Sequence, residues 1–131
     1  MPGPETKEGG KAMRALIVDD TPDIRFMVGF QLKMEGIAFE EAGSGEEAIE
    51  RCASESFDLV VLDFRMPGLS GVDVANKLRS DQYPAQIIIY SAYVDEELQA
   101  AARTLEIPVV DKSDNERLLE AVRTAIGLVP A

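Results

Sequence analysis

The sequence predicts an α/β fold in which a parallel sheet is covered by helices on both faces. About five short apolar runs alternate along the chain with longer segments whose apolar residues recur at helical spacing. The runs are nearly continuous in their apolar character, which is typical of strands buried on both faces. This repeated order of strand and helix indicates a doubly wound sheet.

The strands are expected where apolar runs stop at polar residues. The runs at residues 15–18, 59–62 and 87–90 are the clearest, whereas the second strand is weaker and the fifth is short. The five expected strands are Ala15–Val18, Ile37–Ala42, Leu59–Leu62, Ile87–Tyr90 and Pro108–Val110.

The helices between these strands have recognisable boundaries. Pro22 occupies a favoured first-turn position of the first helix, and Gly36 ends that helix. Ser44 and Glu47 form a capping-box pattern ahead of the second helix. The remaining helices are expected at residues 72–78, 96–105 and 118–126, the last closed by Gly127.

Composition excludes several classes of function. The chain of 131 residues has one cysteine, Cys52, and no histidine, which excludes an intramolecular disulfide, His-dependent nucleophilic catalysis and His-ligated metals. A formal charge of −11 disfavours direct binding to nucleic acid or anionic membranes. No apolar run approaches the ~20 residues of a membrane span, and no signal peptide opens the chain. We therefore expect a cytoplasmic protein.

The domain organisation is expected to be simple. Residues 1–12 are dominated by proline, glycine and charges and have no apolar period, which predicts a flexible leader. Residues 13–131 are expected to form one domain, because no long linker or second core interrupts them.

Chemically capable side chains follow four of the expected strands. Asp19 and Asp20 come after the first, Asp63 after the third, Ser91 after the fourth and Lys112 after the fifth. Right-handed crossovers bring the carboxyl ends of parallel strands to one edge, where open α/β sheets bind ligands. Neighbouring carboxylates repel unless a cation joins them, and Mg²⁺ suits such oxygen ligands. A carboxylate beside Mg²⁺ can act as a nucleophile and form an aspartyl phosphate, while a lysine and a hydroxyl hold the phosphoryl oxygens.

These motifs, taken in order, resemble the receiver domain of two-component response regulators, in particular single-domain chemotaxis-type regulators. The resemblance covers about residues 14–128 and implies a flavodoxin-like, three-layer (βα)5 sandwich with strand order 2-1-3-4-5. The matching segments are LIVDD at 16–20, VVLDFRMPGLSG at 60–71, IIIYSA at 87–92 and DK at 111–112.

The resemblance also implies how the acids would act. Asp63 would be the phosphoacceptor. Asp20, Asp63 and the backbone carbonyl of Arg65 would ligate Mg²⁺, for which Mn²⁺ can substitute, and Asp19 would help mostly through water. The domain would catalyse its own phosphorylation and slow autodephosphorylation and would not be an enzyme acting on external substrates.

The remaining implied roles concern the phosphoryl group and the partners. Ser91 would bind the phosphoryl group and move on activation, Lys112 would pair with it, and the small Ala92 would leave its approach open. The phosphoryl donor would be a sensor histidine kinase or a histidine phosphotransfer protein. The output partner would be an unidentified downstream protein.

Three positions depart from the family pattern. Ser113 replaces the usual proline after Lys112, so we expect a trans Lys112–Ser113 bond and a more mobile loop. Val109 stands where the family usually has a rotating aromatic residue. Arg65 places a guanidinium two residues past Asp63, where it could pair with phosphate oxygens or lie in solvent, and we expect it to change the lifetime of the phosphoryl group.

Phe26 and Phe30 indicate a partner surface. They lie four residues apart in the first expected helix, away from its apolar Ile24, Val28 and Leu32 face. In receiver domains the first helix commonly docks the phosphodonor, so the two rings would anchor a kinase or phosphotransfer protein. The alternative is that they pack against the leader, another helix or a neighbouring molecule.

Two other functions remain open at this point. One is a receiver-like interaction module regulated by contact rather than by phosphorylation, which Val109 and Ser113 favour. The other is a small phosphatase that turns over external substrates through Asp63. The absence from the sequence of a second acid two residues past Asp63 argues against the phosphatase.

Overall fold

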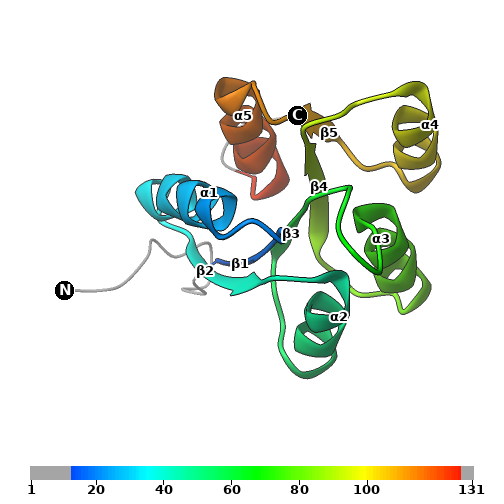
Figure 1. Ribbon diagram of the computed structural model, residues 1–131. Coiled ribbons are helices and arrows are strands. Elements are labelled where there is room, and N and C mark those ends of the chain that lie inside the picture. Colours follow the sequence, from blue (N-terminus) through cyan, green and yellow to red (C-terminus); the bar gives the residue numbers. More distant parts are fainter. Residues whose placement is uncertain (1–12, 128–131) are drawn as a thin grey trace.

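A five-stranded parallel sheet with helices on both faces organises the computed structural model, which describes residues 13–127 (Figure 1). The strand order β2-β1-β3-β4-β5 confirms the predicted fold. The predicted flexible leader, residues 1–12, lies outside the described residues. Strands and helices alternate in the order β1 Arg14–Val18, α1 Pro22–Met34, β2 Ala38–Ala42, α2 Gly45–Ser54, β3 Leu59–Leu62, α3 Gly71–Ser80, β4 Gln86–Ser91, α4 Glu96–Leu105, β5 Val109–Asp111 and α5 Asn115–Ala125.

The sheet separates two hydrophobic cores. Successive side chains of a strand point to opposite faces, so β3, with helices on both sides, is buried at every position. Helices α1 and α5 cover one face, and α2, α3 and α4 cover the other (Figure 1). Strand residues facing α1 and α5 include Ile17, Val61 and Ile88, whereas those facing α2, α3 and α4 include Leu16, Val60 and Ile89.

Two helix starts differ in detail from the expected pattern. The Ser44 hydroxyl accepts from Glu47 N at 3.1 Å, but the Glu47 carboxylate accepts from Gly43 N rather than from the cap residue. The complete reciprocal capping box lies at α3, where Ser70 and Asp73 each accept from the other's backbone N–H. The sequence pattern missed it because aspartate takes the place of the usual glutamate or glutamine.

Gly71 fits α3 against the end of β3. A Cβ added there would collide with the backbone carbonyl oxygen of Asp63. Gly71 N also donates to Phe64 O at 2.8 Å, which fixes the first turn of α3 beside the chain that follows β3. Only a residue without a side chain permits this close approach.

Among residues 13–127, no helix is both long enough and apolar enough to cross a membrane.

We predict that Gly71→Ala lowers the free energy of unfolding by about 2 kcal/mol, because the new methyl group pushes α3 away from the Asp63 backbone. Urea unfolding measures this change. Gly43→Ala is the matched control, since a Cβ there would approach Arg25 Nη1 no closer than 3.4 Å. An equal loss of stability in the two variants would contradict the explanation.

Candidate functional site

The predicted site residues meet at the carboxyl edge of the sheet. Backbone hydrogen bonds extend the strand pairing to these positions: Asp63 N donates to Val18 O at 2.9 Å, and Lys112 N donates to Ser91 O at 2.8 Å. Asp19 N likewise donates to Ala42 O at 3.1 Å. The side chains therefore begin at the same level of the sheet, as the strand order requires.

Three carboxylates cluster at this edge. Asp19, Asp20 and Asp63 each offer one oxygen, and these oxygens lie within 4.8 Å of one another. Asp19 and Asp63 are only 3% and 7% exposed, whereas Asp20 is exposed. Oxygen ligands with several negative charges are the set that a hard divalent cation prefers. The cluster therefore fits Mg²⁺ or Mn²⁺.

Lys112 supplies one positive charge to the cluster. Its Nζ donates to Asp19 Oδ2 at 2.8 Å and lies 3.2 Å from Asp63 Oδ1. Burial lowers the pKa of Lys112, but the hydrogen bond to Asp19 and the charge of Asp63 outweigh that effect, so its pKa is raised overall. Lys112 therefore stays an ammonium group between two buried carboxylates.

The Asp63 carboxyl has a strongly perturbed acidity. Burial, and then the negative charge of Asp19, raise its pKa from 3.8 to about 6, although Lys112 acts in the opposite direction. One ammonium group thus compensates only part of the negative charge. A divalent cation would stabilise the ionised form of Asp63 that a nucleophile needs.

The loop after β1 is held firmly by backbone and side-chain contacts. Thr21 N donates to Asp19 Oδ1 at 2.9 Å, and Arg25 Nη1 donates to the Asp19 carbonyl oxygen at 2.7 Å. The sequence reasoning missed Arg25. A cation near the start of a helix is disfavoured by the helix dipole, and this unfavourable position, five residues past the acidic pair, could have drawn attention to Arg25.

Ser91 is placed at the edge, but its hydroxyl is turned into its own loop. The side chain is buried and donates to Tyr93 O at 2.8 Å, and it accepts from Tyr93 N at 3.2 Å. Among the described residues, no hydrogen bond joins it to Asp63. Ala92 is exposed beside it, and its role in leaving the phosphoryl approach open stays a prediction.

The Arg65 side chain lies against the loop between β4 and α4 rather than at the carboxylate cluster. Its guanidinium lies 5.5 Å from the ring centroid of Phe64 and 5.7 Å from that of Tyr93, and Nη2 lies 3.9 Å from Asp95 Oδ2. Tyr93 and Asp95 were not singled out from the sequence, because this contact joins loops that are distant along the chain. Its effect on phosphoryl lifetime stays a prediction.

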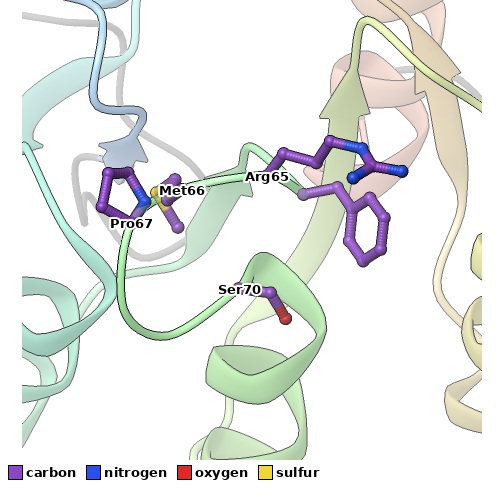
Figure 2. Close-up of a pocket in the computed structure, with 5 residues that line it drawn as sticks. Arg65, Met66, Pro67 and Ser70 are labelled. Atoms are coloured by element: carbon purple, nitrogen blue, oxygen red, sulfur yellow. The ribbon is translucent and has the colours of Figure 1, made fainter.

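The loop that carries Arg65 also borders a surface pocket of about 430 Å³. Figure 2 shows Arg65 on one side of this pocket, Met66 and Pro67 on the other, and Ser70 at the start of α3. The backbone carbonyl of Arg65, the third metal ligand implied by the resemblance, belongs to this loop, and that role stays a prediction.

The loop after β5 shows how the chain accommodates Ser113. The Lys112–Ser113 bond is trans, as expected, since residues 13–127 contain no cis peptide bond. Asp111 Oδ1 accepts from Ser113 N and Ser113 Oγ, at 2.8 and 2.7 Å. Asp114 then caps α5 through Arg117 N. These hydrogen bonds close the turn, and the greater mobility expected of this loop stays a prediction.

The aromatic side chains of α1 form an exposed stripe. Phe26 and Phe30 are 74% and 58% exposed, and Met34, one further turn along the helix, is 71% exposed. The alternative of packing against another helix is therefore wrong within residues 13–127. Contact with residues 1–12 lies outside the described residues.

The chain matches known proteins over most of its length. Residues 15–123 match the response regulator receiver domain family. The chain is 37% identical over 83 residues to the probable transcriptional regulatory protein TcrX of Mycobacterium tuberculosis. That alignment covers 63% of this chain and 36% of TcrX, so the chain spans about a third of the length of this relative.

Solved structures give the same relationship. Response regulator TrrA of Thermotoga maritima, in complex with Mg²⁺ and BeF, matches with a TM-score of 0.78 and 35% identity, over 86% of this chain and 98% of that one. In a further structure TrrA is bound to the histidine kinase ThkA, with a TM-score of 0.77 and 35% identity, over 86% and 97% of the two chains. Since the family match includes every strand end that carries a site residue, the chain belongs to the receiver domain family of two-component response regulators.

Proposed function

We propose that Asp63 accepts a phosphoryl group from a phosphohistidine donor in a reaction that depends on Mg²⁺. The observation that carries this proposal is the buried carboxylate cluster with Lys112 bridging Asp19 and Asp63 at 2.8 and 3.2 Å. An Asp63 oxygen attacks phosphorus, the P–N bond to the donor imidazole breaks, and its electron pair stays on that nitrogen. The products are an aspartyl phosphate and a free histidine.

The metal would be held by this chain's own oxygen atoms. Asp20, Asp63 and the Arg65 carbonyl would bind it directly, and Asp19 would bind it through water. When bound, Mg²⁺ neutralises charge on the phosphoryl oxygens. Support comes from the carboxylate cluster and from TrrA, which was solved with Mg²⁺ and BeF.

Lys112 would hold the transferred group. Its ammonium already lies 3.2 Å from Asp63 Oδ1, so a phosphoryl group on Asp63 would be within reach of a small rotation. This contact would stabilise negative charge on the phosphoryl oxygens in the transition state and in the product. The exposed Ala92 would leave the donor a path to Asp63.

The signal would begin at Ser91. To donate to a phosphoryl oxygen, its hydroxyl must give up the hydrogen bond that it donates to Tyr93 O, and this would also disturb the bond that it accepts from Tyr93 N. Tyr93 contacts the Arg65 guanidinium, and Asp95 caps α4, so the rearrangement would reach the start of that helix. Val109 has no ring to rotate, which makes this loop the proposed route to a downstream protein. Amide chemical shifts of residues 92–96 on phosphorylation would test it.

The stripe formed by Phe26, Phe30 and Met34 is the proposed docking surface for the phosphohistidine donor. TrrA in complex with the kinase ThkA supports a histidine kinase as the partner.

We further propose that residues 13–131 act as one receiver domain in the cytoplasm, with no direct contact with nucleic acid or membranes. The excess of acidic over basic residues supports this.

Regulation by contact alone is the second candidate function. It is favoured by one observation, the Ser91 hydroxyl that is bonded to Tyr93 rather than directed at Asp63. In that case the domain would change partners without a stable aspartyl phosphate.

Phosphorylation with acetyl phosphate tests the main proposal. Intact mass should show the Mg²⁺-dependent gain of one phosphoryl group, and Asp63→Asn should abolish it because the nucleophilic oxygen is lost. Asp81→Asn, an exposed acid at the end of α3, is the control and should keep the gain. No gain from either acetyl phosphate or a phosphohistidine donor would favour regulation by contact.

The raised pKa of Asp63 predicts a pH-dependent cost to folding. The folded protein favours the protonated Asp63 carboxyl over the ionised one. The stabilising contribution of this group to the free energy of unfolding is therefore complete below about pH 4 and is lost as pH rises through about 6. Without metal, wild type should lose about 2 kcal/mol of unfolding free energy relative to Asp63→Asn between pH 4 and pH 8. Urea unfolding at several pH values measures this. A difference that does not change with pH would rule the effect out.

The docking proposal predicts a donor-specific defect. The double variant Phe26→Ala/Phe30→Ala should slow transfer from the cognate phosphohistidine protein at least about tenfold, because two exposed apolar anchors are lost. Phosphorylation by acetyl phosphate, which needs no docking surface, is the control and should keep its rate. Unchanged transfer from the protein donor would refute the assignment.

A further inference from the structure

We infer that Arg25 is a positioning residue that aims Asp20 at the metal site by holding the peptide bond between the two acids. The inference rests on the proposed Mg²⁺ site, whose residues fit a hard divalent cation. It adds to that site a residue of α1 which contributes no ligand atom of its own.

The contacts of Arg25 join three elements at the carboxyl edge of the sheet. From the first turn of α1, Nη1 donates to the Asp19 carbonyl oxygen at 2.7 Å, and Nε donates to Glu41 Oε1 of β2 at 2.9 Å. The side chain is only 18% exposed, although arginine is usually a solvated residue. This burial, together with the two short hydrogen bonds, indicates that the guanidinium is held in one position.

The carbonyl that Arg25 holds belongs to the peptide that joins Asp19 to Asp20. Because a peptide unit is planar, fixing this oxygen also fixes the direction of the following N–Cα bond, and hence the position from which the Asp20 side chain starts. Asp19 needs this contact less. Its N–H is bonded to Ala42 O, and its carboxylate is bonded to Thr21 N and Lys112 Nζ.

Asp20 depends on its backbone for orientation. It is exposed, and within residues 13–127 its side chain forms no hydrogen bond or ion pair. Loss of the Arg25 contact would therefore let the Asp19–Asp20 peptide rotate, and the Asp20 carboxylate would spend less time within reach of Asp63.

The sign of the effect separates positioning from simple electrostatics. A nearby cation repels Mg²⁺, so if charge were its main influence, removing Arg25 would tighten Mg²⁺ binding. The Glu41 carboxylate already offsets the Arg25 charge. Positioning predicts the opposite result, weaker Mg²⁺ binding in the variant.

The test is titration of the metal-free full chain with Mg²⁺ alone. Amide chemical shifts and calorimetry each measure the binding. Arg25→Gln should bind Mg²⁺ about tenfold more weakly, as for other residues that support metal ligands. Arg25→Lys, whose ammonium can reach one acceptor, should fall between it and wild type. Glu41→Gln is the control and should stay within about twofold of wild type, because the contact with Asp19 remains.

A second readout uses acetyl phosphate. In Arg25→Gln the Mg²⁺ concentration that gives half-maximal phosphorylation should rise by the same factor as the dissociation constant for Mg²⁺. The maximal rate of phosphorylation should fall by a smaller factor. If Arg25→Gln does not fold, as judged by thermal unfolding without metal, Arg25→Lys decides: affinity equal to wild type overturns the inference, and weaker affinity supports it.

Asp20→Asn, titrated in parallel, separates the two levels of the proposal. If Asp20→Asn loses Mg²⁺ binding but Arg25→Gln binds as tightly as wild type or more tightly, the positioning inference is wrong and the metal site stands. If wild type itself does not bind Mg²⁺, or Asp20→Asn binds it as well as wild type, the proposed site fails and the inference fails with it.

Discussion

The structure of this edge of the sheet depends on an incomplete charge balance. Asp19 and Asp63 are buried beside Asp20, and Lys112 places a single ammonium group between the two buried acids. Burial and then the uncompensated negative charge raise the pKa of Asp63, and the same charge accounts for the affinity expected toward a divalent cation. The parallel sheet makes this arrangement possible, because strand ends distant in sequence are brought to one level.

The same edge is connected to the surface by contacts of the loop between β4 and α4. The Ser91 hydroxyl is bonded to the Tyr93 backbone, the Tyr93 ring lies beside the Arg65 guanidinium, and α4 begins three residues later. Because Val109 in β5 has no ring to rotate, we propose that the region between β4 and α4 would respond to a new charge on Asp63. A short path of this kind would let a change in one hydroxyl rotamer alter an exposed surface.

Much of the fold could be predicted because the apolar runs in the sequence indicate which segments form buried strands. β3 and α4 have the predicted bounds, and the order of strand ends correctly grouped Asp19, Asp63 and Lys112. What could not be predicted depends on contacts that no local pattern records. The hydrogen bond from Arg25 to a backbone carbonyl and the direction of the Arg65 side chain are set by packing between distant segments. The Ser91 rotamer depends on a loop whose conformation the sequence does not reveal.

Proton release on Mg²⁺ binding tests the charge-balance account most directly. Calorimetric titration with Mg²⁺ in buffers of different ionisation enthalpy gives the number of protons released. With the pKa of Asp63 near 6, about half a proton should be released per Mg²⁺ at pH 6 and almost none at pH 8. Asp63→Asn, which has no proton to lose there, should release almost none at either pH. Mg²⁺ binding by wild type with no proton release at pH 6, and with the same affinity at both pH values, would contradict the account.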